Sequence, residues 1–277
     1  MKQRPSSFDG TAFSLYLQVL GIAFTACLRG QVKNGLKLLV ASVGYWRYWP
    51  NAVTWDCLQM MEGARDVLDV SSPKALSLLM GQRGYRLMAV DLDDPQLKTR
   101  WAETARLLRL TDYQTRHEDA QKLSFPDQSF DFIYSISVIE HIPGDGDAAA
   151  LREMARVLRP GGQAVVEVPL REQHVEIMQE YDSKGFALPK PRFYERHYSA
   201  ASADQRLRIP ELAVEEVWYM TENAAIDPWI ATPRLPRLLR LLILPWEPLL
   251  AILNVSLSTE PGKGKPLSVI LRYRKPL

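Results

Sequence analysis

Two aspartates stand where two short apolar runs end, and their spacing suits the recognition of a nucleoside. Asp69 lies in the run DVLDV, and Asp91 ends the run RLMAVD, 22 positions further on. In nucleotide-binding α/β folds an acid about 20 residues after the first turn meets a ribose diol, and a carboxylate can accept both hydroxyl hydrogens. Asp91 is therefore predicted to bind a ribose. The alternative is a solvated turn, because Asp93 and Asp94 follow.

The turn after Asp69 contains Ser71, Ser72 and Pro73 in place of glycines. A dinucleotide-binding turn would carry G-x-G-x-x-G here, so that the backbone can approach a pyrophosphate. Ser72 suits a helix N-cap and Pro73 suits the first helical position. The turn therefore favours a ligand without pyrophosphate, such as S-adenosylmethionine (SAM). The alternative is that these residues only begin a helix.

The elements that must position these residues alternate between strands and helices. This order predicts parallel βαβ units with right-handed crossovers, and hence a doubly wound, mostly parallel α/β sheet with helices on both faces. Ligands of such sheets bind beyond the carboxyl ends of the strands, which here lie just after Val70, Asp91, Asp119 and Ser135. The expected strands are 66–70, 86–91, 113–118, 130–135, 163–168, 212–220 and 267–273.

Three linked motifs in the middle of the chain carry a family resemblance. The run Glu118–Ile133 contains the pattern D-A-x-x-L, a following Phe-Pro and S-F-D; Glu140-His141-Ile142 comes next, and Arg156–Gly162 reads RVLRPGG. This region resembles the class I SAM-dependent methyltransferases, in particular their small-molecule branch. The resemblance covers roughly Arg65–Val168 and the last two expected strands. It implies a seven-stranded sheet whose last strand is antiparallel, between the fifth and sixth.

The resemblance also implies roles for individual residues. The acid at Asp119 would meet the adenine amino group, and Ala120 would offer its backbone N–H to the ring. Asp69 would lie near the amino group of the cofactor, often through water. The first turn departs from the family, which has glycines there. The expected cofactor-binding residues are Asp69, Ser71, Ser72, Pro73, Asp91, Leu92, Asp119, Ala120 and Ser135.

Candidate catalytic residues follow the fourth expected strand. His141 titrates near neutral pH and can act as a general base where an acceptor must lose a proton; the alternative is that His141 orients a loop. Glu140 is the second candidate, also with a structural alternative, and no metal site is expected. Substrate-binding candidates are Tyr48, in an aromatic run that could instead be core, and Tyr194, His197 and Tyr198 in a later insertion.

Composition limits the other possibilities. The chain has 277 residues, 47% of them hydrophobic, and a net charge of +2, so it can form a sizeable core and does not suit nucleic-acid binding. We expect an N-terminal helical cap over 1–62 and a SAM-binding domain over 63–277, with insertions at about 170–210 and 224–264. The uncharged stretch Ala12–Leu28 is expected to be a buried or interfacial helix. Two cysteines are consistent with a reducing cytoplasm.

Together these features predict a methyltransferase that uses SAM to methylate a bulky, mostly apolar small-molecule or lipid-like acceptor. The leucine-rich apolar stretch 235–257 is broken by prolines, so it cannot form one continuous span. It is instead expected to cover the substrate or to contact a membrane surface, with extra core or a dimer contact as the alternative. A catalytically inactive SAM-fold scaffold is the second functional hypothesis. A nucleotide-dependent oxidoreductase is disfavoured by the missing phosphate-binding turn. The acceptor atom and the oligomeric state are left open.

Overall fold

The computed structural model describes residues 7–41, 45–92, 97–181, 187–223 and 246–277. The expected insertion over 224–264 and the expected membrane contact over 235–257 therefore fall partly outside the described residues. The helices and strands are α1 (Ser7–Leu28), α2 (Val32–Ala41), α3 (Tyr48–Gln59), β1 (Asp66–Val70), α4 (Lys74–Gln82), β2 (Arg86–Asp91), the π-helical turn η1 (Leu97–Trp101), α5 (Ala102–Leu107), β3 (Tyr113–His117), β4 (Phe130–Ile136), the 3₁₀ turn η2 (Ile139–His141), α6 (Gly146–Val157), β5 (Leu158–Pro169), β6 (Val175–Tyr181), β7 (Ala187–His197), α7 (Ala200–Leu207), β8 (Ala213–Glu222), α10 (Glu247–Asn254), β9 (Val255–Ser258) and β10 (Lys265–Arg274).

One large sheet carries the fold, in the order β3-β2-β1-β4-β5-β10-β8-β9. Strands β1 to β5 are parallel, and β10 is antiparallel to both β5 and β8, which confirms the α/β class and the antiparallel last strand. The sheet has eight strands where seven were expected. The extra strand is β9, which follows α10 directly and pairs with the edge of β8.

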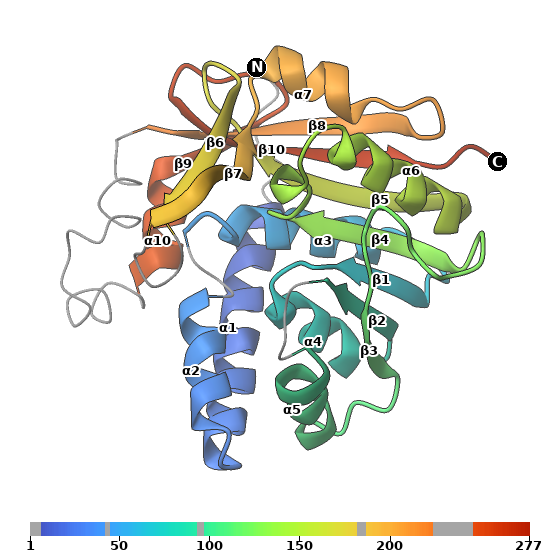
Figure 1. Cartoon of the computed structure of the whole chain (residues 1–277). Coiled ribbons are helices and arrows are strands. Elements are labelled where there is room, and N and C mark those ends of the chain that lie inside the picture. Colours follow the sequence, from blue (N-terminus) through green and yellow to red (C-terminus); the bar gives the residue numbers. More distant parts are fainter. Residues whose placement is uncertain (1–6, 42–44, 93–96, 182–186, 224–245) are drawn as a thin grey trace.

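Helices cover both faces of this sheet (Figure 1). One hydrophobic cluster joins the sheet to α1, α3 and α4, and a second joins the opposite face to α6 and α7. Successive side chains of β1 point to opposite faces of the sheet, so the strand contributes to both clusters. Val67 belongs to the first cluster, and Leu68 and Val70 belong to the second. Asp69 shares the face of Val67, so its carboxylate points toward the helices of the first cluster.

Helix α1 is the longest helix among the described residues and lies against α2 and α3. Its segment Gly10–Leu28 is the one described helix long and apolar enough for a membrane span, with a mean hydropathy of 1.7. Leu15, Val19 and Ile22 nevertheless pack into the first cluster. This face of α1 is therefore part of the core of the domain.

Strands β6 and β7 form a separate antiparallel hairpin that stands apart from the large sheet (Figure 1). The hairpin lies within the expected insertion at 170–210 and returns the chain to β5, where Tyr198 N–H donates to Pro169 O at 3.0 Å. Strand β7 also contacts η2. The hairpin thus brings its residues to the carboxyl end of β4.

Candidate active site

The carboxyl ends of β1, β2 and β3 form one continuous edge. Ser71 N–H donates to Val90 O at 2.9 Å, and Glu118 N–H donates to Asp91 O at 3.3 Å. Asp91 and Asp119 consequently follow neighbouring strands, and both side chains are partly exposed. The order of the sheet reverses between β1 and β4, which is where doubly wound folds bind ligands.

The first turn keeps the backbone path of a glycine turn without glycine. Ser71 has a φ of 57°, in the left-handed region that favours glycine. The Ser72 hydroxyl accepts a hydrogen bond from Ile136 N–H at 2.9 Å and so ties the turn to the end of β4. Ser72 was expected to cap the helix; instead the helix begins at Lys74 with Pro73 at the N-cap and no capping side chain.

A buried ion pair lies beneath this turn. Lys74 Nζ is 3.2 Å from Asp69 Oδ2, and the two side chains are 3% and 0% exposed. The other carboxylate oxygen, Oδ1, accepts Ser72 N–H at 2.8 Å. Burial raises the pKa of Asp69, and Lys74 and the Ser72 amide oppose that rise. The carboxylate of Asp69 is therefore engaged by its own chain.

The nine cofactor-binding residues expected from the sequence divide by their exposure. Ser71, Pro73, Asp91, Leu92 and Asp119 are at least partly exposed along the edge, and the Cβ of Ala120 is nearly buried beside them. The remaining expected cofactor residues are closed off from solvent: Asp69, Ser72 and Ser135.

A second group of polar residues follows β4 and β5. Ser137 has a φ of 54°, and its hydroxyl donates to Glu167 Oε2 at 2.9 Å. Glu140 lies in η2 and is 2% exposed, and Glu167 is 4% exposed. Among the described residues, Glu140 Oε2 has no hydrogen-bond partner.

The two glutamates and a nearby arginine influence one another electrostatically. Burial raises the pKa of Glu140 well above its ordinary value, and the charge of Glu167 raises it further. Burial also raises the pKa of Glu167, against the hydrogen bond from Ser137 and the charge of Arg47. Arg47 precedes α3, and burial lowers its pKa while the two glutamates oppose that fall. The helical cap thus supplies the cation of this group.

His141 is held in one orientation by the hairpin. Its Nδ1 lies 2.9 Å from the carbonyl oxygen of Tyr194, and the two rings meet edge to face at 5.4 Å. Because a carbonyl oxygen can only accept, Nδ1 carries a proton in this contact, and Nε2 is the nitrogen directed away from Tyr194. Nε2 lies 3.8 Å from both Glu140 Oε1 and Glu195 Oε2. His141 therefore presents a basic nitrogen between two carboxylates.

His197 lies on the far side of Glu195. Its Nε2 is 2.9 Å from Glu195 Oε1, and its Nδ1 accepts a hydrogen bond from Arg171 Nε at 3.2 Å. An open pocket of about 430 Å³ adjoins this pair, lined in part by Gln173, Lys265 and Pro266. The structure therefore brings three predicted residues to one place: His141, Tyr194 and His197.

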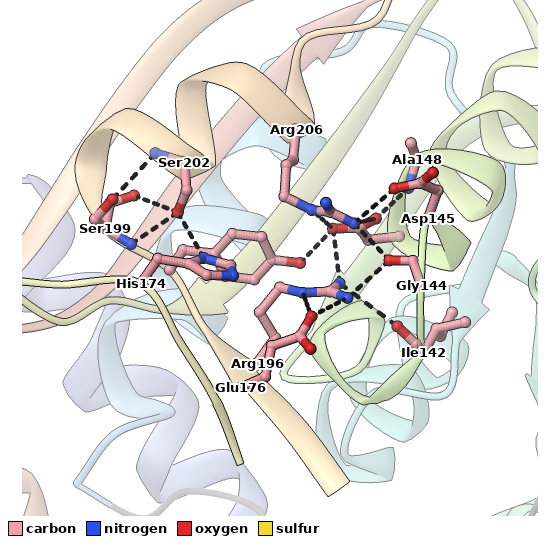
Figure 2. Close-up of polar contacts among 12 residues, drawn as sticks. Ile142, Gly144, Asp145, Ala148, His174, Glu176, Arg196, Ser199, Ser202 and Arg206 are labelled. Atoms are coloured by element: carbon pink, nitrogen blue, oxygen red, sulfur yellow. Dashed lines mark hydrogen bonds and ion pairs between the residues drawn. The ribbon is translucent and has the colours of Figure 1, made fainter. Parts of the chain in front are cut away.

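A buried network fixes the hairpin to the start of α6 (Figure 2). Asp147 Oδ2 lies 3.0 Å from Arg196 Nη1 and 2.8 Å from Arg206 Nε, and Arg196 and Asp147 are both 0% exposed. Tyr198 donates its hydroxyl to the same oxygen at 2.8 Å. Burial acts to raise the pKa of Asp147, but the hydrogen bonds from Arg206 and Tyr198 outweigh it and lower the pKa.

Two substrate-binding predictions need correction. Tyr198 is 0% exposed and serves the Asp147 network, so its ring and hydroxyl are not available to a substrate. Tyr48 is 1% exposed and packs edge to face on Trp49 in the first hydrophobic cluster. An aromatic run at helical spacing is here part of the core, which was the alternative interpretation.

Several residues of the site escaped the sequence analysis. The ion pair of Lys74 with Asp69 could have been predicted from the sequence, because Lys74 stands within one helical turn of the strand that contains Asp69. Glu195 lies between two residues that were predicted, Tyr194 and His197. Arg47 carried no signal, since its partners follow it by about a hundred residues in the chain.

Comparison with known proteins agrees with this fold. Residues 68–166 match the family described as a methyltransferase domain. The chain is 31% identical over 181 residues to the ubiquinone/menaquinone biosynthesis C-methyltransferase UbiE of Shewanella oneidensis, covering 62% of this chain and 67% of that protein. It spans less of other relatives, for example 58% of the UbiE of Edwardsiella ictaluri.

Solved structures share the fold at low sequence identity. Coclaurine N-methyltransferase bound to N-methylheliamine and S-adenosylhomocysteine superposes with a TM-score of 0.58 at 15% identity, covering 98% of this chain and 87% of that chain. The [4+2]-cyclase SpnF gives 0.53 at 20% identity, covering 86% and 83%. The family model matches, the chain covers 67% of the UbiE of Shewanella oneidensis, and the fold is shared. The chain therefore belongs to the class I SAM-dependent methyltransferases, whose cofactor is S-adenosylmethionine.

Proposed function

We propose that the chain transfers a methyl group from SAM to a bulky, mostly apolar small-molecule or lipid-like acceptor, with His141 as the general base. The observation that carries the proposal is the orientation of His141, whose Nδ1 is fixed by Tyr194 O at 2.9 Å. Nε2 is left to accept a proton, and the carboxylate of Glu195 at 3.8 Å favours the imidazolium that results.

The residues of the sheet edge would hold the cofactor. Asp91 would accept the two ribose hydroxyls, Asp119 the adenine amino group, and Ala120 N–H would donate to the ring. Ser71, Pro73 and Leu92 would lie along the cofactor. The buried Asp69 and Ser72 hold the turn through hydrogen bonds, and Ser135 lies buried in β4. SAM, when bound, supplies an electrophilic methyl group on its sulfonium.

Protein groups would then position the acceptor and remove its proton. An acceptor O–H, N–H or activated C–H would face His141 Nε2, which would take up the proton that the acceptor loses on methylation. Burial raises the pKa of Glu140, so this carboxyl can hold a proton at the site while Glu195 stays ionised. Tyr194, which is 47% exposed, and His197 would contact the acceptor.

The nature of the acceptor is supported by the relatives and by the apolar surface near the site. The UbiE proteins are named for quinone biosynthesis, and coclaurine N-methyltransferase holds N-methylheliamine. In the described part of 235–257, Trp246, Leu249 and Leu253 are exposed on one side of α10. We propose that this segment contacts a membrane surface and that the protein acts in the cytoplasm.

A second candidate is a SAM-fold protein without methyltransferase activity. The buried Asp69–Lys74 pair favours this candidate, because it occupies the acid expected near the amino group of the cofactor. A likeness in fold to a [4+2]-cyclase shows that this architecture is not confined to methyl transfer.

Calorimetry with SAM and transfer of isotope from labelled SAM to a lipid and small-molecule extract separate the two candidates. Saturable SAM binding together with an extractable labelled product that disappears in His141→Ala supports the enzyme. Binding without any labelled product supports the second candidate, and the absence of SAM binding contradicts the enzyme and leaves only an inactive scaffold.

A further inference from the structure

The outer side of α1 is an apolar surface with no partner among the described residues. Four large side chains lie along it at intervals of four, seven and four residues, which places them in one row of the helix. Their exposed fractions are 51% for Phe13, 51% for Leu17, 65% for Phe24 and 73% for Leu28. We call these four residues the outer stripe. Two residues of α2 extend it, Val32 and Leu36, both 51% exposed.

The opposite side of α1 rules out a membrane span for the folded protein. Leu15, Val19 and Ile22 are each 3% exposed and pack into the core shared with α3 and α4. A span would need these side chains to face lipid, so the core would have to open. Only the outer stripe is available, and it can enter a lipid surface only while α1 lies flat along it.

Charges around the outer stripe match an anionic surface. The segment Gly10–Leu28 contains no charged residue, and exposed cations gather just beyond its end. Arg29 and Lys33 belong to the turn and to α2, and Arg29 donates to Leu107 O at the end of α5, where Arg106 and Arg109 are also exposed. Glu103 is the acid nearby and accepts a hydrogen bond from Gln31. Figure 1 shows α1, α2 and α5 reaching the same end of the molecule.

This charge pattern favours a membrane over a second copy of the chain as the partner. A two-fold contact around the turn between α1 and α2 would bring the same cations together from both copies, whereas phospholipid headgroups neutralise them. Helix α10, with its own exposed Trp246 and Leu253, packs against α1.

We propose that the outer stripe of α1, together with the cations at its end, docks the protein flat on an anionic phospholipid membrane. The proposal extends the membrane contact proposed for α10, but it does not depend on methyl transfer. It assigns the binding energy to apolar insertion by α1 and to headgroup contacts by Arg29, Lys33, Arg106 and Arg109.

Co-sedimentation of the full chain with phosphatidylcholine vesicles, with and without phosphatidylglycerol, tests the proposal. We expect binding that requires phosphatidylglycerol and weakens as salt is added. The variant Phe24→Glu/Leu28→Glu should bind on the order of tenfold or more weakly. Lys33→Gln/Arg106→Gln should lose the preference for phosphatidylglycerol. Met60→Glu is the matched control, since Met60 is 58% exposed after α3 and outside this surface; its binding should be unchanged.

Circular dichroism and SAM calorimetry of each variant accompany the vesicle experiment. Unchanged spectra and unchanged SAM binding with lost vesicle binding support the proposal, whatever the outcome for methyl transfer. Equal vesicle binding by Phe24→Glu/Leu28→Glu and the parent chain overturns it, and so does a parent chain that does not bind. If light scattering shows a dimer that the same variant dissociates while vesicle binding persists, the surface is an interface between copies and the proposal is wrong.

Discussion

Lys74 Nζ lies 3.2 Å from Asp69 Oδ2 beneath the first turn of the nucleotide-binding edge, and both side chains are almost completely buried. The lysine supplies, from within the chain, a cation beside the acid that the family is expected to direct toward the amino group of its cofactor. The turn above therefore keeps its shape through internal contacts, with Ser72 joining Asp69 to Ile136.

Removal of this cation tests how much the turn depends on it. Lys74→Met should lower the free energy of unfolding by about 3–5 kcal/mol, because it leaves a buried carboxylate without its partner. Urea denaturation measures the change. Asp69→Asn/Lys74→Met should recover much of the loss, and Lys33→Met, at an exposed lysine, should have little effect. A loss below about 1 kcal/mol for Lys74→Met would show that the pair does not stabilise the turn.

Asp91 is expected to dominate the recognition of the ribose. Asp91→Ala should weaken SAM binding by about 1–3 kcal/mol through the loss of two charge-assisted hydrogen bonds. Calorimetry gives the affinity. Asp112→Ala is the control, because Asp112 is an exposed acid at the opposite end of the strands. Equal affinities for Asp91→Ala and the parent chain would remove Asp91 from the site.

His141→Gln should slow methyl transfer by about 10²–10⁴-fold while leaving SAM affinity unchanged, since the imidazole is proposed to take a proton rather than to bind the cofactor. The rate should be measured with the labelled acceptor identified from extract. His174→Gln serves as a control, because His174 bonds Ser202 on the hairpin side away from Glu140. A variant at His141 with full activity would assign the histidine to loop positioning.

The sequence analysis anticipated the fold and the sheet edge because both depend on local patterns. Asp69 and Asp91 lie at the ends of apolar runs, Asp119 follows a weaker expected strand, and parallel strands bring such residues to one edge. Arg47 and the Asp147–Arg196 pair could not be anticipated, since nothing within a few residues of either partner marks a contact between distant segments. Glu195 depended on the register of β6 and β7, which irregular pairing shifts twice. The extra strand β9 was hidden in a leucine-rich stretch that resembles helix as much as strand.

Stability should depend on pH through Glu140. Burial raises its pKa well above the ordinary value of 4.5, so the native state binds more protons than the unfolded state over that interval. The corresponding stability is present below pH 4.5 and is lost as pH rises through the raised pKa. Glu140→Gln should remove this loss. The free energy of unfolding of the variant, relative to that of the parent chain, should therefore increase by roughly 1 kcal/mol or more from pH 5 to pH 8. Chemical denaturation at both pH values measures it, with the exposed Glu172→Gln as control; equal shifts for both variants would contradict the assignment.

The hairpin should loosen when its buried anchor is removed. Asp147→Ala leaves the fully buried Arg196 without its carboxylate and should cost about 3–5 kcal/mol of stability. Hydrogen exchange should rise first in 175–197, and activity should fall because Tyr194 no longer fixes His141. Asp145→Ala provides the comparison, since Asp145 contacts Arg206 but is 91% exposed. Uniform exchange across the chain in Asp147→Ala would mean that the anchor supports the whole domain instead.

The position of β10 also governs how the protein can be made. This strand lies between β5 and β8, which end about a hundred and about forty residues before it begins. Until residues 265–274 have left the ribosome, β5 and β8 each present an open edge, and apolar side chains such as Val166 and Met220 lack a neighbouring strand on that side. During synthesis the nascent domain therefore passes through a stage in which two unpaired strand edges are exposed. At this stage, chaperone binding or aggregation competes with completion of the sheet.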